Sequence, residues 1–157
     1  MIYYLNMWIP LAVLLPSLVM IGLPPHNTPD LSGSRSVRGL VIAEGIGRIG
    51  VFAAPLVSPL HHKTIGEWAG GLGMAVFLLL YYAGWLRYFV RGREFGLLYR
   101  PLLGISVPLA VLPVLYFAAA SVVLHSGWML LAAVILGAGH IPASMLMYRE
   151  IANGGAD

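Results

Sequence analysis

The feature that most limits how this chain can fold is a series of five long apolar stretches separated by short polar segments. They lie near residues 3–23, 37–60, 68–90, 102–124 and 128–148. An α-helix needs about 20 apolar residues to cross the hydrocarbon core of a bilayer. Backbone groups in lipid must be hydrogen-bonded within the protein, and the alternating pattern of β-barrel strands is absent. We therefore predict an all-α integral membrane protein, a bundle of about five transmembrane helices forming one domain over residues 1–157.

The composition of the chain agrees with this prediction. Hydrophobic residues make up 59% of it and charged residues 10%, whereas soluble domains carry roughly 25% charged residues. Nearly all the side chains behind the net charge of +3 lie between the apolar stretches, so we interpret them as signals of orientation and expect no nucleic-acid partner. The chain has no cysteine, which excludes disulfides, a thiol nucleophile and cysteine-ligated metal centres.

The distribution of Lys and Arg predicts how the helices are oriented. With five spans, one side of the membrane receives Arg35, Arg38, Arg87, Arg91, Arg93, Arg100 and Arg149, and the other receives Lys63. By the positive-inside rule the arginine-rich side is cytoplasmic, so the N-terminus is expected outside and the C-terminus inside, in a multi-pass protein of the cell membrane. A four-span arrangement that leaves out residues 37–60 would place Arg35, Arg38, Arg48 and Lys63 together on the outer side, opposite the cluster from Arg87 to Arg100. Five spans therefore fit the rule better.

The second apolar stretch contains the most informative polar residues, Glu44 and Arg48. Four residues apart, their side chains lie on one face of a helix, where they can form an ion pair. Ionisable groups inside a membrane are costly and are candidates for function by default. The alternative is a self-satisfied pair that only fixes helix packing. A separate seam of small residues permits close approach of another helix and consists of Gly39, Ala43, Gly47, Gly50 and Ala54.

A histidine, His140, lies deep in the fifth stretch, between Gly139 and Pro142. Glycine allows close backbone approach, and the proline frees a carbonyl in the preceding turn. If His140 lay near Glu44, the two could relay a proton, but the sequence does not show whether they are adjacent. The alternative is a neutral histidine bonded to a backbone carbonyl or a tyrosine. Secondary candidates for the lining of such a site are Tyr81, Tyr82 and Tyr116, although aromatic residues near helix ends also form interfacial belts.

Two further clusters lie at the predicted membrane surfaces. On the outer side, His61, His62 and His125 are candidate ligands for a metal or a haem, but no H-x-x-x-H spacing supports this, and solvated loop histidines are the alternative. On the cytoplasmic side, a basic collar is a candidate site for anionic lipid head groups and consists of Arg87, Arg91, Arg93 and Arg100.

Together these residues predict a small helical bundle with a polar site inside the membrane. The expected function is the binding or transport of a small molecule, ion or proton by Glu44, Arg48 and His140. Two alternatives stay open: an intramembrane enzyme acting on a lipid or quinone-like substrate, and an accessory subunit of a larger membrane complex. The expected partners are membrane lipids and either further copies of the chain or a larger membrane protein. Phosphate-loop, nucleophile-elbow and dinucleotide motifs are absent, so catalysis of the kinds found in soluble enzymes has no support.

Overall fold

The computed structural model describes residues 2–28 and 37–154, and this part of the chain is helical in all five predicted stretches. The helices are α1 (Trp8–Gly22), α2 (Arg38–Val57), α3 (Ile65–Val90), α4 (Pro108–Val123) and α5 (Gly127–Gly154). Two short 3₁₀ helices, η1 (Tyr4–Met7) and η2 (Phe95–Leu98), precede α1 and α4. The predicted all-helical fold is confirmed for the described residues.

Four segments are long and apolar enough to cross a membrane: η1 with α1, α2, α3 and α5. The chain is therefore a multi-pass membrane protein with four candidate spans. Helix α4 is apolar but has only 16 residues, about 24 Å at 1.5 Å per residue, against a hydrocarbon core of about 30 Å. The fifth crossing and the orientation of the bundle stay predictions.

The start predicted for the fourth span, residue 102, is wrong by six residues. Leu102 and Ile105 instead exchange backbone hydrogen bonds of 3.1 and 2.9 Å across a tight turn, with Leu103 and Gly104 at positive φ. Val107 is also left-handed, with φ at 44°, and Pro108 is the first helical residue, because proline disfavours the α conformation in the residue before it. These turn residues are as apolar as a helix, so hydropathy alone does not reveal the boundary.

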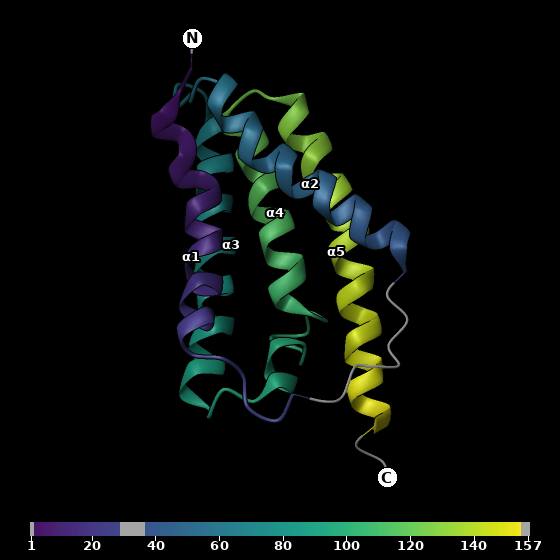
Figure 1. Ribbon diagram of the computed structural model, residues 1–157. Coiled ribbons are helices and arrows are strands. Elements are labelled where there is room, and N and C mark those ends of the chain that lie inside the picture. Colours follow the sequence, from purple (N-terminus) through teal and green to yellow (C-terminus); the bar gives the residue numbers. More distant parts are fainter. Residues whose placement is uncertain (1, 29–36, 155–157) are drawn as a thin grey trace.

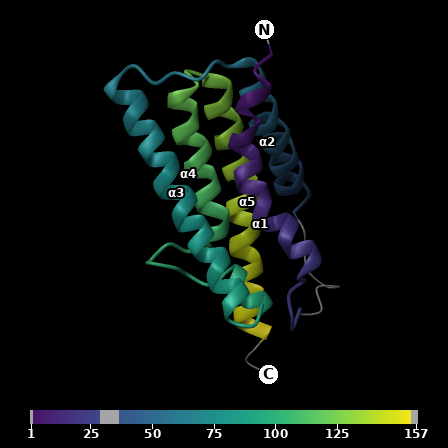
Figure 2. The same ribbon diagram turned by 90° about the vertical axis from the view of Figure 1, so that its left-hand side faces the viewer.

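The five helices form an elongated bundle. Figures 1 and 2 show α1, α3, α4 and α5 along the length of the molecule, whereas α2 lies across α5 and begins short of the end where the C-terminus emerges. At that end, the segment after α1 pairs with the segment after α3. His26 N donates to Arg93 O at 2.8 Å, and Phe95 N donates to His26 O at 3.0 Å. These bonds tie the C-terminal end of α1 to the C-terminal end of α3.

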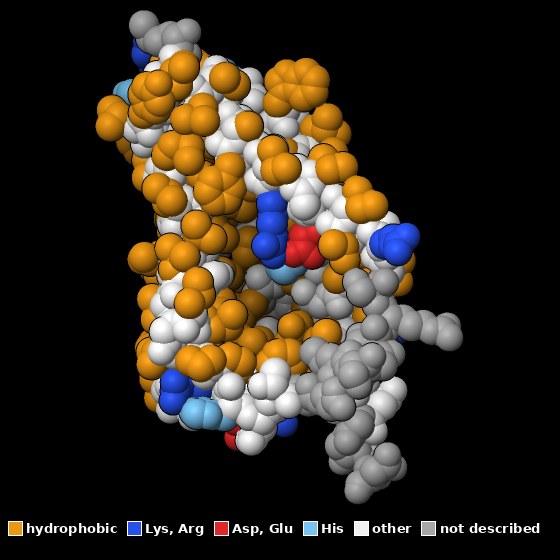
Figure 3. All heavy atoms as spheres, in the orientation of Figure 1, with side chains coloured by type: hydrophobic (Ala, Val, Ile, Leu, Met, Phe, Trp, Pro, Cys, Tyr) orange, Lys and Arg blue, Asp and Glu red, His pale blue; other side chains and the backbone are white. Residues whose placement is uncertain are grey.

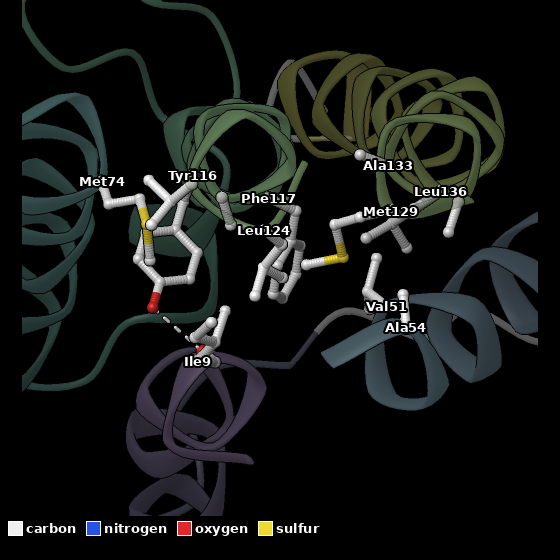
Figure 4. Packing of buried hydrophobic residues seen from close by; sticks show 13 residues of the cluster. Ile9, Val51, Ala54, Met74, Tyr116, Phe117, Leu124, Met129, Ala133 and Leu136 are labelled. Carbon is white, nitrogen blue, oxygen red and sulfur yellow. Dashed lines mark hydrogen bonds between the residues drawn. The ribbon is translucent and has the colours of Figure 1, made fainter. Parts of the chain in front are cut away.

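The larger of two hydrophobic clusters draws residues from all five helices, Met74 of α3 among them (Figure 4). Phe117 and Met129 occupy its centre beside Val51. At its edge, the hydroxyl of Tyr116 donates a hydrogen bond to Ile9 O at 3.1 Å. The second cluster contains Tyr81, Trp85, Tyr88, Leu97 and Leu112. Many large apolar side chains, by contrast, remain exposed on the outer faces of the helices, as a surface in contact with lipid requires.

The closest helix contact is the crossing of α2 and α5. A Cβ atom added to Gly47 would lie 2.7 Å from Leu136 Cβ and still closer to the Leu136 backbone. A Cβ added to Gly50 would lie 2.6 Å from Ala132 Cβ, and one added to Gly139 would lie 2.5 Å from Leu40 O. The predicted small-residue seam is thus confirmed at Gly47 and Gly50, which let the two backbones touch.

We expect Gly47→Ala to destabilise the bundle by about 1–3 kcal/mol, because the new methyl group overpacks the contact with α5. Gly45→Ala is the matched control, since a Cβ at Gly45 meets nothing within 4 Å and alanine favours a helix. Unfolding in detergent, followed by circular dichroism, measures both variants. Equal stability of the two would contradict the close crossing.

Candidate functional site

The structure brings Glu44, Arg48 and His140 together. Glu44 Oε1 accepts a hydrogen bond from Arg48 Nη2 on the next turn of α2 and lies 3.1 Å from His140 Nδ1 on α5. Gly139, the residue before His140, packs directly on the backbone of Glu44. The side chain of Arg48 is 62% exposed, that of His140 28% and that of Glu44 19%. The carboxylate is thus the inner member, held between a cation and an imidazole.

A cavity of about 440 Å³ opens beside this cluster, and all five helices contribute to its wall. Arg48 and His140 belong to the lining, and Glu44 contacts both of them. Most other lining residues are apolar, among them Pro10, Val13 and Phe117. Figure 3 shows a basic, an acidic and a histidine side chain meeting at the edge of a hollow whose visible walls are largely hydrophobic. The volume is in the range of cavities that hold small molecules.

The three predicted tyrosines all donate to carbonyl groups of α1, but only Tyr81 lines the cavity. Its hydroxyl donates to Val13 O at 3.1 Å. Tyr82 donates to Ala12 O at 2.8 Å, the carbonyl that Pro16 leaves without a helical N–H donor. The third, Tyr116, is buried in the core, where it donates to Ile9 O. Tyr82 and Tyr116 therefore attach α1 to α3 and α4.

Sequence reasoning missed four lining residues with polar groups, Ser17, Trp85, Tyr99 and Ser144. Trp85 follows Tyr81 by four residues, so their shared helical face was a usable signal. Tyr99 lies in the segment after η2, where no sequence pattern indicates which way its side chain faces. Burial, together with the negative charge of Glu44, raises the pKa of Tyr99. Its hydroxyl is therefore a neutral hydrogen-bonding group.

The predicted outer histidines form a different arrangement. The rings of His61 and His125 stack with centroids 4.2 Å apart and planes 8° apart, and His62 is exposed. His125 Nε2 lies 2.9 Å from Oε1 of Glu67, a buried carboxylate that also accepts from Thr64 N at 2.8 Å. Across residues 2–28 and 37–154, no three His, Asp or Glu side chains are grouped so that they could hold a metal ion.

Two arginines of the basic collar bind other parts of the protein, and the other two are exposed. The guanidinium of Arg87 donates to the carbonyl oxygens of Leu97, Arg100 and Pro101 at 2.8–3.0 Å, which fixes the segment after η2. Arg93 Nη2 lies 2.7 Å from His26 Nε2. Arg91 and Arg100 are exposed. Half of the predicted collar thus holds the end of the bundle together.

No protein-family model, curated protein or solved structure matches this chain. The features of this chain that point to a function are the cavity and the cluster of Glu44, Arg48 and His140 at its edge.

Proposed function

We propose that this membrane protein binds a small amphiphilic molecule, with its apolar body in the cavity and its anionic head group on Arg48. The observation that carries the proposal is the position of Arg48, a largely exposed guanidinium at the edge of an apolar cavity. Among the described residues, only Glu44 accepts a hydrogen bond from it. A guanidinium has five N–H donors in a planar fork that matches a carboxylate or phosphate, so most of its donors are available to a ligand.

His140 provides the second hydrogen-bonding group of the proposed site. Its Nδ1 faces Glu44, so Nε2, on the opposite side of the ring, is the nitrogen that can contact a ligand in the cavity that His140 lines. A head group between Arg48 and His140 would have a cation on one side and an imidazole on the other. The apolar remainder of the lining suits an alkyl chain or ring system.

Charge balance predicts that the protein takes up a proton when it binds the anionic ligand. Glu44 and Arg48 already compensate each other, so an anion added to Arg48 would leave one negative charge uncompensated in a low-dielectric site. Uptake of one proton between Glu44 and His140, which share a 3.1 Å contact, restores neutrality. Binding of an anionic ligand should therefore be coupled to protonation.

The first test compares stearic acid with stearyl alcohol, which has the same chain without the charge. In detergent or nanodiscs, we expect Arg48→Met to weaken stearic acid binding about tenfold or more, because a charge-assisted hydrogen bond is lost. Alcohol binding should change little. Competition against a fluorescent fatty acid measures both affinities.

Arg38→Met is the matched control, since Arg38 is an exposed arginine at the start of the same helix. The double variant Glu44→Gln with Arg48→Met shows whether an unpaired Glu44 alone weakens binding. Stearic acid that binds wild type, Arg48→Met and Arg38→Met equally would refute the proposal.

The second test uses stearyl sulfate, whose charge does not titrate near neutral pH. For the wild type, we expect affinity to rise as the pH falls, because the complex takes up a proton that the free protein lacks. Glu44→Gln leaves Arg48 uncompensated, so the anion itself restores neutrality and the pH dependence should disappear. Calorimetry in buffers of different ionisation enthalpy counts the protons taken up. Equal pH dependence in both proteins would contradict the coupling.

A second candidate function is acid–base catalysis on a lipid or quinone-like substrate. It is favoured by the 3.1 Å contact of Glu44 and His140, in which a carboxylate orients an imidazole for proton transfer. The expected result is conversion of a lipid extract by wild type and not by His140→Gln, which keeps a hydrogen-bonding side chain. Mass spectrometry of extracts before and after incubation detects the product. Binding without any conversion would remove this candidate and leave the first.

A further inference from the structure

The end of the bundle where α3 stops has two exposed arginines, Arg91 and Arg100. Arg91 directly follows α3, and Arg100 comes after η2. Residues 85–107 contain four arginines and only one acidic residue, Glu94. Among residues 2–28 and 37–154, neither Arg91 nor Arg100 forms an ion pair with a carboxylate. Their positive charges are therefore open to an anionic partner.

Arg87 is the neighbour that these two arginines share. Arg91 follows Arg87 by one helical turn, so both residues lie on one face at the end of α3. Nη2 of Arg87 donates to the backbone carbonyl of Arg100 at 2.8 Å, which holds the segment after η2 beside that face. The charges of Arg91 and Arg100 both lie close enough to Arg87 to repel its guanidinium. Because like charges this close destabilise one another, an anion bound among them would be stabilised.

An exposed apolar stripe on α3 ends at these arginines. It consists of Leu79, Leu86 and Val90, which are all largely exposed and share one helical face by their spacing. Because α3 is a candidate membrane span, an exposed apolar face on it is in contact with lipid chains. Val90 directly precedes Arg91, so the stripe ends where the positive charge begins. Figure 2 shows the segment between α3 and α4 projecting from the bundle beside α3, and Leu103 in its tight turn is exposed as well.

We propose that Arg91 and Arg100 bind the phosphate of an anionic phospholipid whose acyl chains lie along the apolar stripe. A phosphate matches the planar fork of a guanidinium, and the chains attached to it would cover the exposed leucine and valine side chains. A zwitterionic phospholipid carries a cation beside its phosphate, so the arginines should bind it less well. Neither arginine lines the cavity, so this site is separate from the one proposed for Arg48.

The experiment uses a phosphatidic acid with a photoactivatable diazirine beside the phosphate, added to the purified protein in an uncharged detergent. Peptide mass spectrometry after illumination locates and quantifies the label. In the wild type, we expect label within residues 86–103. Unlabelled phosphatidic acid should displace it about tenfold more effectively than phosphatidylcholine with the same chains. Glycerol phosphate, which lacks the chains, should not displace it.

Variants of the two arginines test which residues bind the lipid. Arg91→Gln with Arg100→Gln should lower the labelling of this segment about tenfold, because two charge-assisted contacts with the phosphate are lost. Arg91→Lys with Arg100→Lys keeps both charges and should retain most of the labelling. The matched control, Arg38→Gln with Lys63→Gln, removes the same charge from two exposed residues near the starts of α2 and α3. It should label like the wild type.

Arg48→Met should leave the labelling of this segment unchanged, because the cavity is a separate site. Equal labelling of the wild type and the glutamine variant would overturn the inference, as would equal displacement by the two lipids. Displacement by glycerol phosphate would indicate a site for soluble phosphate, and loss of the label in Arg48→Met alone would assign the lipid to the cavity. Either result would also overturn it.

Discussion

The site depends on one packing contact, the crossing of α2 and α5 through glycine. Gly139 packs against the backbone of Leu40 and Glu44, and Gly47 packs against Leu136. Since His140 follows Gly139 directly, the contact that brings the helices together also brings the imidazole to the carboxylate. A side chain at either glycine would push the two helices apart and break the contact between the Glu44 carboxylate and the His140 imidazole. Helix packing and the chemistry of the site are therefore consequences of the same close approach.

The cavity exists because α1 is attached in a different way from α2. The hydroxyl groups of Tyr81, Tyr82 and Tyr116 donate to carbonyls of α1, and Pro16 frees the Ala12 carbonyl that one of them uses. The hydrogen bonds from these tyrosines keep α1 about one tyrosine side chain away from the backbones of α3 and α4. The glycines, by contrast, let the backbones of α2 and α5 touch. The space left between these two kinds of contact is lined by Val13 and Ser17 on one side and by His140 on the other.

Hydropathy was sufficient to predict the five helices, and the four-residue spacing was sufficient to predict the Glu44–Arg48 pair, because both depend on local sequence. The start of α4 was missed because the turn before it is as apolar as a helix. The contact of His140 with Glu44 depends on the register of two helices, which no local pattern encodes. The sequence placed Arg87 in the basic collar because of its charge alone. Its structural role was not predictable, because its three carbonyl partners lie in a segment whose fold the sequence does not show.

In the described part of the chain, two glutamate carboxylates lie close to a histidine ring nitrogen, and their other partners explain why only one is a candidate for function. Glu67 accepts from the backbone N–H groups of Lys63 and Thr64 at the start of α3, so its carboxylate caps a helix and cannot turn away without exposing those donors. Within residues 2–28 and 37–154, the partners of the Glu44 carboxylate are side chains alone, those of Arg48 and His140, and both of these line the cavity. Side chains can exchange partners when a ligand arrives, whereas backbone donors in a helix are fixed. The polar cluster at the cavity is therefore adjustable, and the one at the end of the bundle is structural.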